Sequence, residues 1–361
     1  MMVEEKHLTP LEEATYPLFL GVSFGGKFLK IGIVDSDART ISYFAAPTES
    51  GHGPESSTQA MASAILQALE KTGLKPSDIT GAGLAFPGSM DPQTNRLHRP
   101  PNYPDWKGFP ITERLTELTG LPSIRFSNNA NASAYGESWI GAGKGTHSLC
   151  LLELERGIGC GIIVEGREVA GANGYGGEFG HMIVDSSPGA RWCNCQQQGH
   201  LEAYVSATGV ARRTRELLEI GLKTSLQERI NHDTALYDIP RMVYEEAVKG
   251  DPLANEIIME TGRVLGVALV TLVHTIDPAC ILIGGEMMFG GKGSEIGEKF
   301  LERAREEIRA RAFKDLSANL NLDFATLGSY ASYIGAAGLA REETFLFAIA
   351  ENENSNGGQN Q

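Results

Sequence analysis

The decisive stretch of this chain reads Gly176-Gly177-Glu178-Phe179-Gly180-His181, then eleven residues, then Cys193-Asn194-Cys195, then Gly199-His200-Leu201-Glu202. It brings two histidines and two cysteines close together in the sequence. Four nitrogen and sulfur ligands are the number and the chemistry of a closed, tetrahedral structural zinc site. The spacing differs from that of zinc fingers. The residues alone therefore leave a second interpretation open, in which the cysteines only pack in a core and the histidines are exposed.

The same stretch resembles the signature of the ROK family of sugar kinases, Gly-Glu-x-Gly-His and then Cys-x-Cys-Gly-x-x-Gly-Cys-x-Glu. Two positions depart from it: Gln196 stands where the family has glycine, and His200 stands where it has the last cysteine. A histidine can replace a cysteine on zinc. The resemblance therefore implies a structural zinc ion held by His181, Cys193, Cys195 and His200.

In the family, the two glutamates and the histidine of the signature contact the sugar, which implies this role for Glu178, His181 and Glu202. A carboxylate can accept two sugar hydroxyls at once. Further matches are Gly88 after Pro87, Asn102 after Pro101 with Trp106 four residues on, and Asn128. Taken singly, Asn102 and Asn128 are a turn residue or a helix cap. The resemblance, which covers roughly residues 17–345, instead implies sugar-hydroxyl contacts.

The order of expected elements shows two similar halves. Each half opens with a strand, a glycine turn and a strand, at 18–22 and 29–35 and again at 148–154 and 161–165 around Gly157-Ile158-Gly159. Each half later has a strand that ends in glycine, at 79–86 and at 280–283. Apolar spacing and stop signals predict helices at 57–72, 111–119, 128–139 and 252–276. This pattern predicts a duplicated α/β unit with ligands at the strand ends.

With the resemblance, the expected fold is α/β, a duplicated actin-like ATPase (ribonuclease H-like) fold of two domains with a central cleft. We expect an N-terminal extension at 1–16 and an N-terminal α/β domain at 17–130, completed by a C-terminal helix at about 331–345. A larger C-terminal α/β domain with the zinc site is expected at 131–330. The tail 351–361 is poor in apolar residues and is predicted to be disordered.

The phosphate motifs of the family are degenerate here. The first turn reads Ser23-Phe24-Gly25-Gly26-Lys27 where the family has Asp-x-Gly-Gly-Thr, and the second reads Glu155-Arg156-Gly157-Ile158-Gly159 where it has Gly-Thr-Gly-Ile-Gly. The glycines that let the backbone approach a phosphate remain. The nucleotide or phosphate residues implied by the resemblance are Ser23, Gly25, Gly26, Lys27, Arg156, Gly157, Gly159, Gly284 and Gly285.

The catalytic position is also changed. The chain reads Asn128-Asn129-Ala130-Asn131-Ala132 where the family has Asn-Asp-Ala-Asn-Ala, so Asn129 stands at the place of the general-base aspartate. An amide can accept a hydrogen bond from a sugar hydroxyl, but it cannot take the proton at neutral pH. The one substitute base we would test is Asp105, whose plainer interpretation is a solvated loop acid.

Three functions follow. The family implies an ATP-dependent hexokinase of glucokinase type, a phosphotransferase that uses Mg-ATP and here has weakened or lost catalysis. The alternative is a non-catalytic pseudokinase that senses a hexose or hexose phosphate, since Lys27 and Arg156 favour a bare anion. A third, a ROK repressor, carries a helix-turn-helix module ahead of the kinase fold. The first strand near residue 17 leaves no room for one, so this function is disfavoured.

Composition sets the remaining expectations. The 361 residues suit two domains, and a net charge of −14 disfavours a nucleic-acid partner. Five cysteines do not suggest a disulfide framework. The acidic N-terminus is not a secretory signal, and no run of eighteen apolar residues predicts a membrane span. We therefore expect a cytoplasmic protein with a small-molecule sugar partner, and the family implies a homo-oligomer, a dimer or tetramer.

Overall fold

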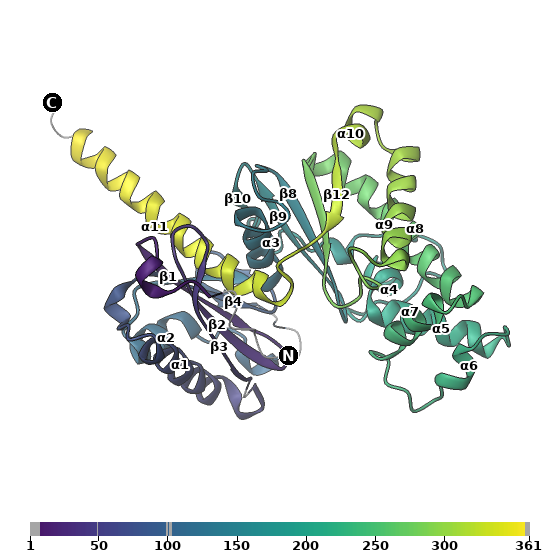
Figure 1. Cartoon of the computed structure of the whole chain (residues 1–361), viewed down its shortest axis with the longest axis horizontal. Helices are drawn as coiled ribbons and strands as arrows, with labels where there is room; N and C mark the ends of the chain where they lie inside the picture. Colours follow the sequence, from purple (N-terminus) through teal and green to yellow (C-terminus); the bar gives the residue numbers. More distant parts are fainter. Residues whose placement is uncertain (1–7, 49, 99, 101–102, 358–361) are drawn as a thin grey trace. The chain divides into compact units, whose positions relative to one another are not determined.

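The computed structural model describes residues 8–48, 50–98, 100 and 103–357, and they form two compact units (Figure 1). Unit 1 takes in the chain up to Gly145, the segment Glu168–Gly176 and the chain from Ser329 onward. Unit 2 takes in Thr146–Arg167 and Gly177–Gly328. The chain therefore enters unit 2 twice, and the short segment 168–176 between the two visits belongs to unit 1.

Unit 1 is built on a five-stranded sheet with the order β3-β2-β1-β4-β7. Its strands are β1 (Leu18–Phe24), β2 (Phe28–Val34), β3 (Thr40–Pro47), β4 (Ile79–Phe86) and β7 (Ile124–Asn128), and a small ribbon pairs β5 (Met90–Asp91) with β6 (Arg96–Leu97). β1 and β2 pair antiparallel, as predicted for the opening hairpin, and β4 and β7 run parallel to β1.

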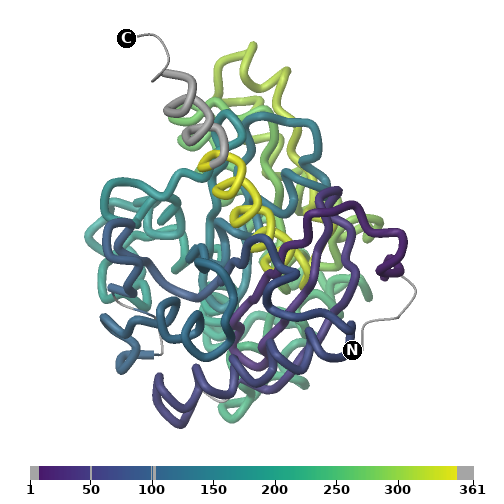
Figure 2. Tube along the Cα trace, turned by 90° about the vertical axis from the view of Figure 1, so that its left-hand side faces the viewer, coloured from purple at the N-terminus to yellow at the C-terminus, as the bar shows by residue number. Residues whose placement is uncertain are grey.

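Helices cover both faces of this sheet: α1 (Gly53–Lys71), α2 (Ile111–Thr119), α3 (Asn129–Trp139) and α11 (Ala331–Gly357). The alternation of side chains along β1 assigns the faces. Leu20 and Phe24 join the hydrophobic core that α1 and α2 close. Gly21 and Ser23 face α11, where a Cβ on Gly21 would collide with the carbonyl of Tyr333. Figure 2 shows α11 lying alongside these N-terminal strands.

α11 packs closely on α3, which explains why α3 belongs to unit 1 although the sequence placed a boundary at residue 130. A Cβ on Gly335 would collide with the carbonyl of Ala132, so glycine permits the two helix backbones to touch. α11 also continues to Gly357, where the sequence predicted disorder from residue 351. Helical hydrogen bonding extends through that polar stretch, and residues 358–361 lie outside the described residues.

Unit 2 repeats the plan, with the strand order β10-β9-β8-β11-β12. Its strands are β8 (Leu149–Leu154), β9 (Ile158–Val164), β10 (Arg167–Glu168), β11 (Cys280–Gly284) and β12 (Asn321–Phe324). The edge strand β10 ends at Glu168, the residue at which the segment of unit 1 begins. β8 and β9 form the antiparallel hairpin, and β11 and β12 run parallel to β8. The predicted second strand was placed too late, because β9 already begins at Ile158 and the turn is confined to residues 155–157.

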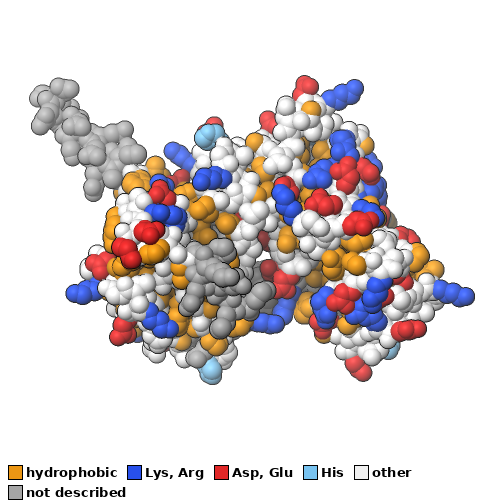
Figure 3. Space-filling view, viewed as in Figure 1, with side chains coloured by type: hydrophobic (Ala, Val, Ile, Leu, Met, Phe, Trp, Pro, Cys, Tyr) orange, Lys and Arg blue, Asp and Glu red, His pale blue; other side chains and the backbone are white. Residues whose placement is uncertain are grey.

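The helices of unit 2 are α4 (Glu202–Val205), α5 (Ala207–Glu219), α6 (Leu226–Arg229), α7 (Ile239–Val248), α8 (Pro252–Ile276), α9 (Glu295–Arg311) and α10 (Lys314–Asn319). α8 is long and apolar enough to cross a membrane, but many of its residues, including Ile258 and Leu265, are buried in the core of unit 2. A core helix passes the same length and composition test. On α9, acids and arginines pair along the helix, as with Arg303 and Glu307, and Figure 3 shows the two signs interspersed there.

Candidate functional site

The structure brings the four predicted metal ligands of unit 2 together. The ligand atoms of His181, Cys193, Cys195 and His200 all lie within 4.8 Å of one another. His181 Nδ1 lies 3.2 Å from His200 Nδ1, and Cys193 Sγ lies 3.7 Å from His181 Nδ1. In a tetrahedral zinc site, bonds of about 2.05 Å to nitrogen and 2.3 Å to sulfur place two nitrogens about 3.3 Å apart and a nitrogen and a sulfur about 3.5 Å apart. The donor set and its spacing therefore fit zinc.

The loop that carries these ligands is held by its own backbone. Short bridges pair Ile183 with His200 and Trp192 with Gln198, which folds the chain back on itself. Cys193 N donates to Gln197 O, and Gln196 in between has φ 68°, a left-handed conformation that favours glycine. The position where the family signature has glycine thus keeps the glycine-like backbone with a glutamine.

The pKa values of Cys193 and His200 in this cluster are shifted in directions that suit a bound cation. Burial, and then the nearby Glu202 carboxylate, raise the pKa of the Cys193 thiol to about 12. A thiolate at neutral pH there requires a neighbouring positive charge, which a metal ion supplies. Burial and the adjacent His181 lower the pKa of His200, which favours the neutral imidazole that binds metal.

The predicted sugar carboxylates of unit 2 lie beside this cluster. Glu202 Oε1 accepts a hydrogen bond from Cys193 Sγ at 3.2 Å, and its Oε2 accepts one from Ile158 N at 3.1 Å. A Cβ on Gly157 would collide with Glu202 Oε2, so a larger residue there would displace this carboxylate from its present position. Glu178 is exposed, and its carboxylate lies 3.7 Å from His181 Nε2. The glutamate of the sugar signature and the second glycine turn are therefore one connected structure.

In unit 1, the asparagines of α3 hold separate segments of chain. Asn128 caps α3 by accepting from Ala130 N at 2.7 Å, and its Nδ2 donates to Gly88 O at 2.9 Å. Asn129 Nδ2 donates to Phe24 O at the end of β1, at 3.1 Å. Its Oδ1 is buried and has no hydrogen-bond partner among the described residues. The amide therefore presents one free acceptor.

The residue at the place of the lost phosphate-site aspartate is also engaged. Ser23 is buried, and Ser332 Oγ of α11 donates to Ser23 Oγ at 2.7 Å. In the turn that follows, Gly25 is fixed by Phe28 O and Thr48, while Gly26 and Lys27 are exposed.

The second turn carries Arg156, whose guanidinium stacks over the Tyr237 ring at 4.2 Å from the ring centroid. Thr208 Oγ1 donates to the carbonyl of Arg156 and fixes the backbone. Gly159, predicted in this turn, lies in β9 instead. Gly284 ends β11, and Gly285 has φ 92° where a Cβ would collide with Leu154.

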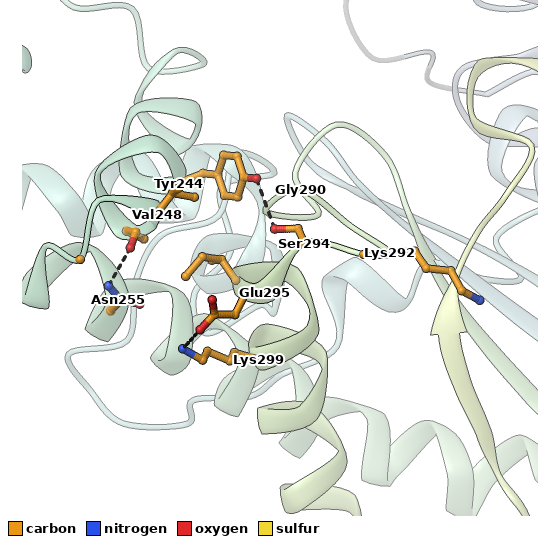
Figure 4. Close-up of a pocket in the computed structure, with 12 residues that line it drawn as sticks. Tyr244, Val248, Asn255, Gly290, Lys292, Ser294, Glu295 and Lys299 are labelled. Atoms are coloured by element: carbon orange, nitrogen blue, oxygen red, sulfur yellow. Dashed lines mark hydrogen bonds and ion pairs between the residues drawn. The ribbon is translucent and has the colours of Figure 1, made fainter.

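Beyond Gly285 the chain borders a cavity of about 640 Å³ within unit 2 (Figure 4). It lies between the end of α7, the start of α8 and the start of α9. Tyr244 Oη and Ser294 Oγ share a hydrogen bond at 3.2 Å on one wall, and Lys299 pairs with Glu295 on another. Gly284 and Gly285 are not among its lining residues.

Two further sequence predictions concern the loop before α2. Asn102 lies outside the described residues. Asp105 is exposed in a short 3₁₀ turn, while Trp106 beside it is buried and packs against Phe24 and Phe86. The sequence did not single out Ser332 and Tyr237, which contact the predicted residues Ser23 and Arg156. It also did not single out Glu168, which accepts hydrogen bonds from Ser127 and Asn131 on either side of the Asn128–Asn129 pair. No local motif marks these three residues.

The fold and the two sets of site residues define an actin-like ATPase-fold protein of the sugar-kinase type. The sequence profile of the ROK family matches residues 19–343, and the chain belongs to this family. A glucokinase of Halalkalibacterium halodurans is 30% identical over 325 residues, which cover 90% of this chain and 95% of that protein.

Solved structures and other relatives also belong to the ROK family or resemble this chain over most of its length. The crystal structure of a ROK family glucokinase from Streptomyces griseus in complex with glucose and AMPPNP has a TM-score of 0.69 at 29% identity, over 90% of this chain and 100% of that one. The family also includes regulators. A xylose repressor of Caldicellulosiruptor bescii is 25% identical over 91% of this chain and 79% of that protein.

Proposed function

We propose that this protein binds a hexose and that its ATP-dependent phosphoryl transfer to the sugar is weakened or lost. The observation that carries the proposal is the state of Asn129. Its side-chain nitrogen donates to Phe24 O, and its Oδ1 has no hydrogen-bond partner among the residues that the structure describes. Because a buried polar atom without a partner is costly, Oδ1 is suited to accept a sugar hydroxyl.

The loss of the base has a defined kinetic cost. A positioned general base contributes about 10²–10⁴-fold to a rate. An amide at this position accepts the hydroxyl hydrogen bond without removing the proton. Phosphoryl transfer relies mainly on positioning and electrostatics, so binding and slow transfer are compatible.

The change at position 23 acts on the same step. Magnesium is bound by carboxylates and water, and Ser23 offers no carboxylate. Its hydroxyl is bonded to Ser332 and ties β1 to α11. The two acidic positions of the family motif therefore serve here as neutral links within unit 1. A bound Mg-ATP would therefore find no carboxylate at positions 23 and 129.

The zinc cluster has a structural part in this proposal. Zinc held by the four ligands fixes the loop next to Glu178 and Glu202, which present carboxylate oxygens to a sugar. We propose hydroxyl contacts for these glutamates and for Asn128 and Asn129. The metal itself takes no part in transfer.

A coupled assay of ATP consumption with glucose, mannose, N-acetylglucosamine and fructose tests the proposal, with the double variant Asn129→Asp/Ser23→Asp beside the wild type. We expect little turnover from the wild type and a rise of at least about a hundredfold in the double variant. Turnover by the wild type at ordinary hexokinase rates would refute weakened catalysis. Calorimetry with the same sugars and no ATP tests binding separately.

A second candidate is a sensor of a hexose phosphate. The observation that favours it is an exposed cation in each degenerate turn: Lys27 in unit 1, and in unit 2 Arg156, whose guanidinium stacks on the Tyr237 ring. Cations and backbone amides together favour a bare anion. Calorimetry with glucose 6-phosphate against glucose tests this, with Lys27→Met as the matched variant. Equal affinity for the two ligands would exclude the sensor.

A further inference from the structure

Glu168 is a buried carboxylate at an unusual place. It is the first residue of the segment 168–176 that belongs to unit 1, and its side chain is 7% exposed. No motif of the family signature, as matched in this chain, includes it. A buried carboxylate requires hydrogen-bond donors, and the identity of those donors indicates its purpose.

The donors come from both sides of the two site asparagines. Glu168 Oε1 accepts from Ser127 Oγ at 2.9 Å and from Asn131 Nδ2 at 2.8 Å. Ser127 precedes Asn128 at the end of β7, and Asn131 follows Asn129 in the first turn of α3. One oxygen atom therefore joins the strand end to the helix start across the Asn128–Asn129 pair.

Two further features show that this junction is built. Arg125 Nη2 lies 3.4 Å from Glu168 Oε2 and offsets the buried charge. Because a carboxylate only accepts hydrogen bonds, Asn131 must turn its Nδ2 toward Glu168. Its Oδ1 is then buried without a partner in the described part of the chain. That oxygen belongs to a residue that lines a cavity of about 30 Å³ together with Asn128 and Glu168, enough for about one water molecule.

We propose that Glu168 is a positioning residue for sugar binding: by holding Ser127 and Asn131 it sets the place of Asn128 and Asn129 between them. The inference rests on the proposed function, since it assumes that these asparagines contact the sugar. In enzymes, a misplacement of about 1 Å in an active-site group can lower the reaction rate by about a hundredfold. Hydrogen bonds to a sugar also weaken when the binding group moves. Loss of the Glu168 carboxylate is therefore expected to lower the affinity for the sugar.

Calorimetry of the full chain with glucose tests the proposal on wild type, Glu168→Leu, Glu168→Gln and Ser127→Ala. We expect the leucine variant to bind glucose at least about tenfold more weakly, because hydrogen bonds to a charged group are lost. Glu168→Gln keeps an acceptor oxygen in place, so its glucose Kd is expected within about threefold of wild type. The Kd of Ser127→Ala is expected to lie between those of Glu168→Gln and Glu168→Leu.

Asp35→Asn is the matched control. Asp35 is also a buried carboxylate of unit 1, held by Arg39 and by backbone amides in the β2–β3 turn, away from α3 in the sequence. The substitution Asp35→Asn should lower the melting temperature and leave the glucose Kd unchanged. A leucine variant at 168 with the wild-type Kd, or an equal loss of affinity in Asp35→Asn, would overturn the proposal.

Hydrogen exchange of residues 127–133 without sugar separates this proposal from the proposed function. Glu168→Leu should speed exchange there, and Glu168→Gln and Asp35→Asn should not. If the wild type does not bind glucose, the proposed function fails for this sugar. The exchange result then tests the positioning role of Glu168 by itself. Unchanged exchange in Glu168→Leu refutes the positioning role.

Discussion

Restoring the acid at position 129 tests both the chemistry and the packing of the site. In the wild type, Asn129 Nδ2 donates to Phe24 O at 3.1 Å. In Asn129→Asp, a carboxylate oxygen faces this carbonyl, so a hydrogen bond is replaced by two opposed acceptors. Leaving buried polar groups unsatisfied costs about 1–3 kcal/mol. We expect the variant to lose this much unfolding free energy at pH 8, and to gain turnover as a base becomes available.

The sign of the pH dependence follows from the same contact. The repulsion raises the pKa of the new aspartate above about 3.9, its ordinary value. A raised folded pKa leaves stability intact below the unfolded pKa and removes it as pH rises through the folded pKa. The difference between wild type and variant should therefore grow from about pH 4 to about pH 7, because a cost of about 1–3 kcal/mol corresponds to a rise of about one to two pK units.

Urea unfolding across this pH range and the coupled ATP assay at pH 8 provide the measurements. Asn319→Asp is the matched control, because Asn319 Nδ2 also donates to a backbone carbonyl, that of Asp315, but on the exposed helix α10. It should change the unfolding free energy by less than about 0.5 kcal/mol. If Asn129→Asp is as stable as wild type at every pH, the hydrogen bond from Asn129 to Phe24 O contributes nothing to stability. If its turnover equals that of wild type, the absence of a general base at this position is not what limits the rate.

Three other results are expected. Elemental analysis should find about one zinc per chain, and Cys193→Ser should lose the metal and melt at a lower temperature; full metal content in that variant would exclude this ligand set. Gly157→Ala should displace Glu202 and weaken sugar binding by about tenfold or more without unfolding unit 2, which calorimetry and circular dichroism can check together. Burial alone would raise the pKa of Asp35, but backbone amides and Arg39 outweigh it and hold the pKa below its usual range. The stability this carboxylate contributes should be present above about pH 3.9 and lost as pH falls below it, so Asp35→Asn should destabilise the protein at pH 7 and not at pH 2.

Patterns of local spacing were enough for much of the fold. The strand–glycine turn–strand openings of both halves and the bounds of α8 at Pro252 and Ile276 follow from periodicity and turn residues. The four residues of the candidate metal cluster, His181, Cys193, Cys195 and His200, lie on one loop, so their spacing in the sequence already indicated that they meet. The helix α11 runs on to Gly357, into the polar tail for which composition predicted disorder, because the tail continues the helical turns that precede it.

The candidate site divides along the same line. The motifs alone indicated which acids are missing, since Ser23 and Asn129 stand where the family motif has aspartate. Only the tertiary structure showed what these residues do instead: Ser23 is bonded to Ser332, 309 positions away, and Asn129 to Phe24, 105 positions away. Such partnerships depend on which strand and helix faces meet, and that depends on packing rather than on any local pattern. A motif can therefore reveal a lost carboxylate, whereas the contact that replaces it is visible only in the folded chain.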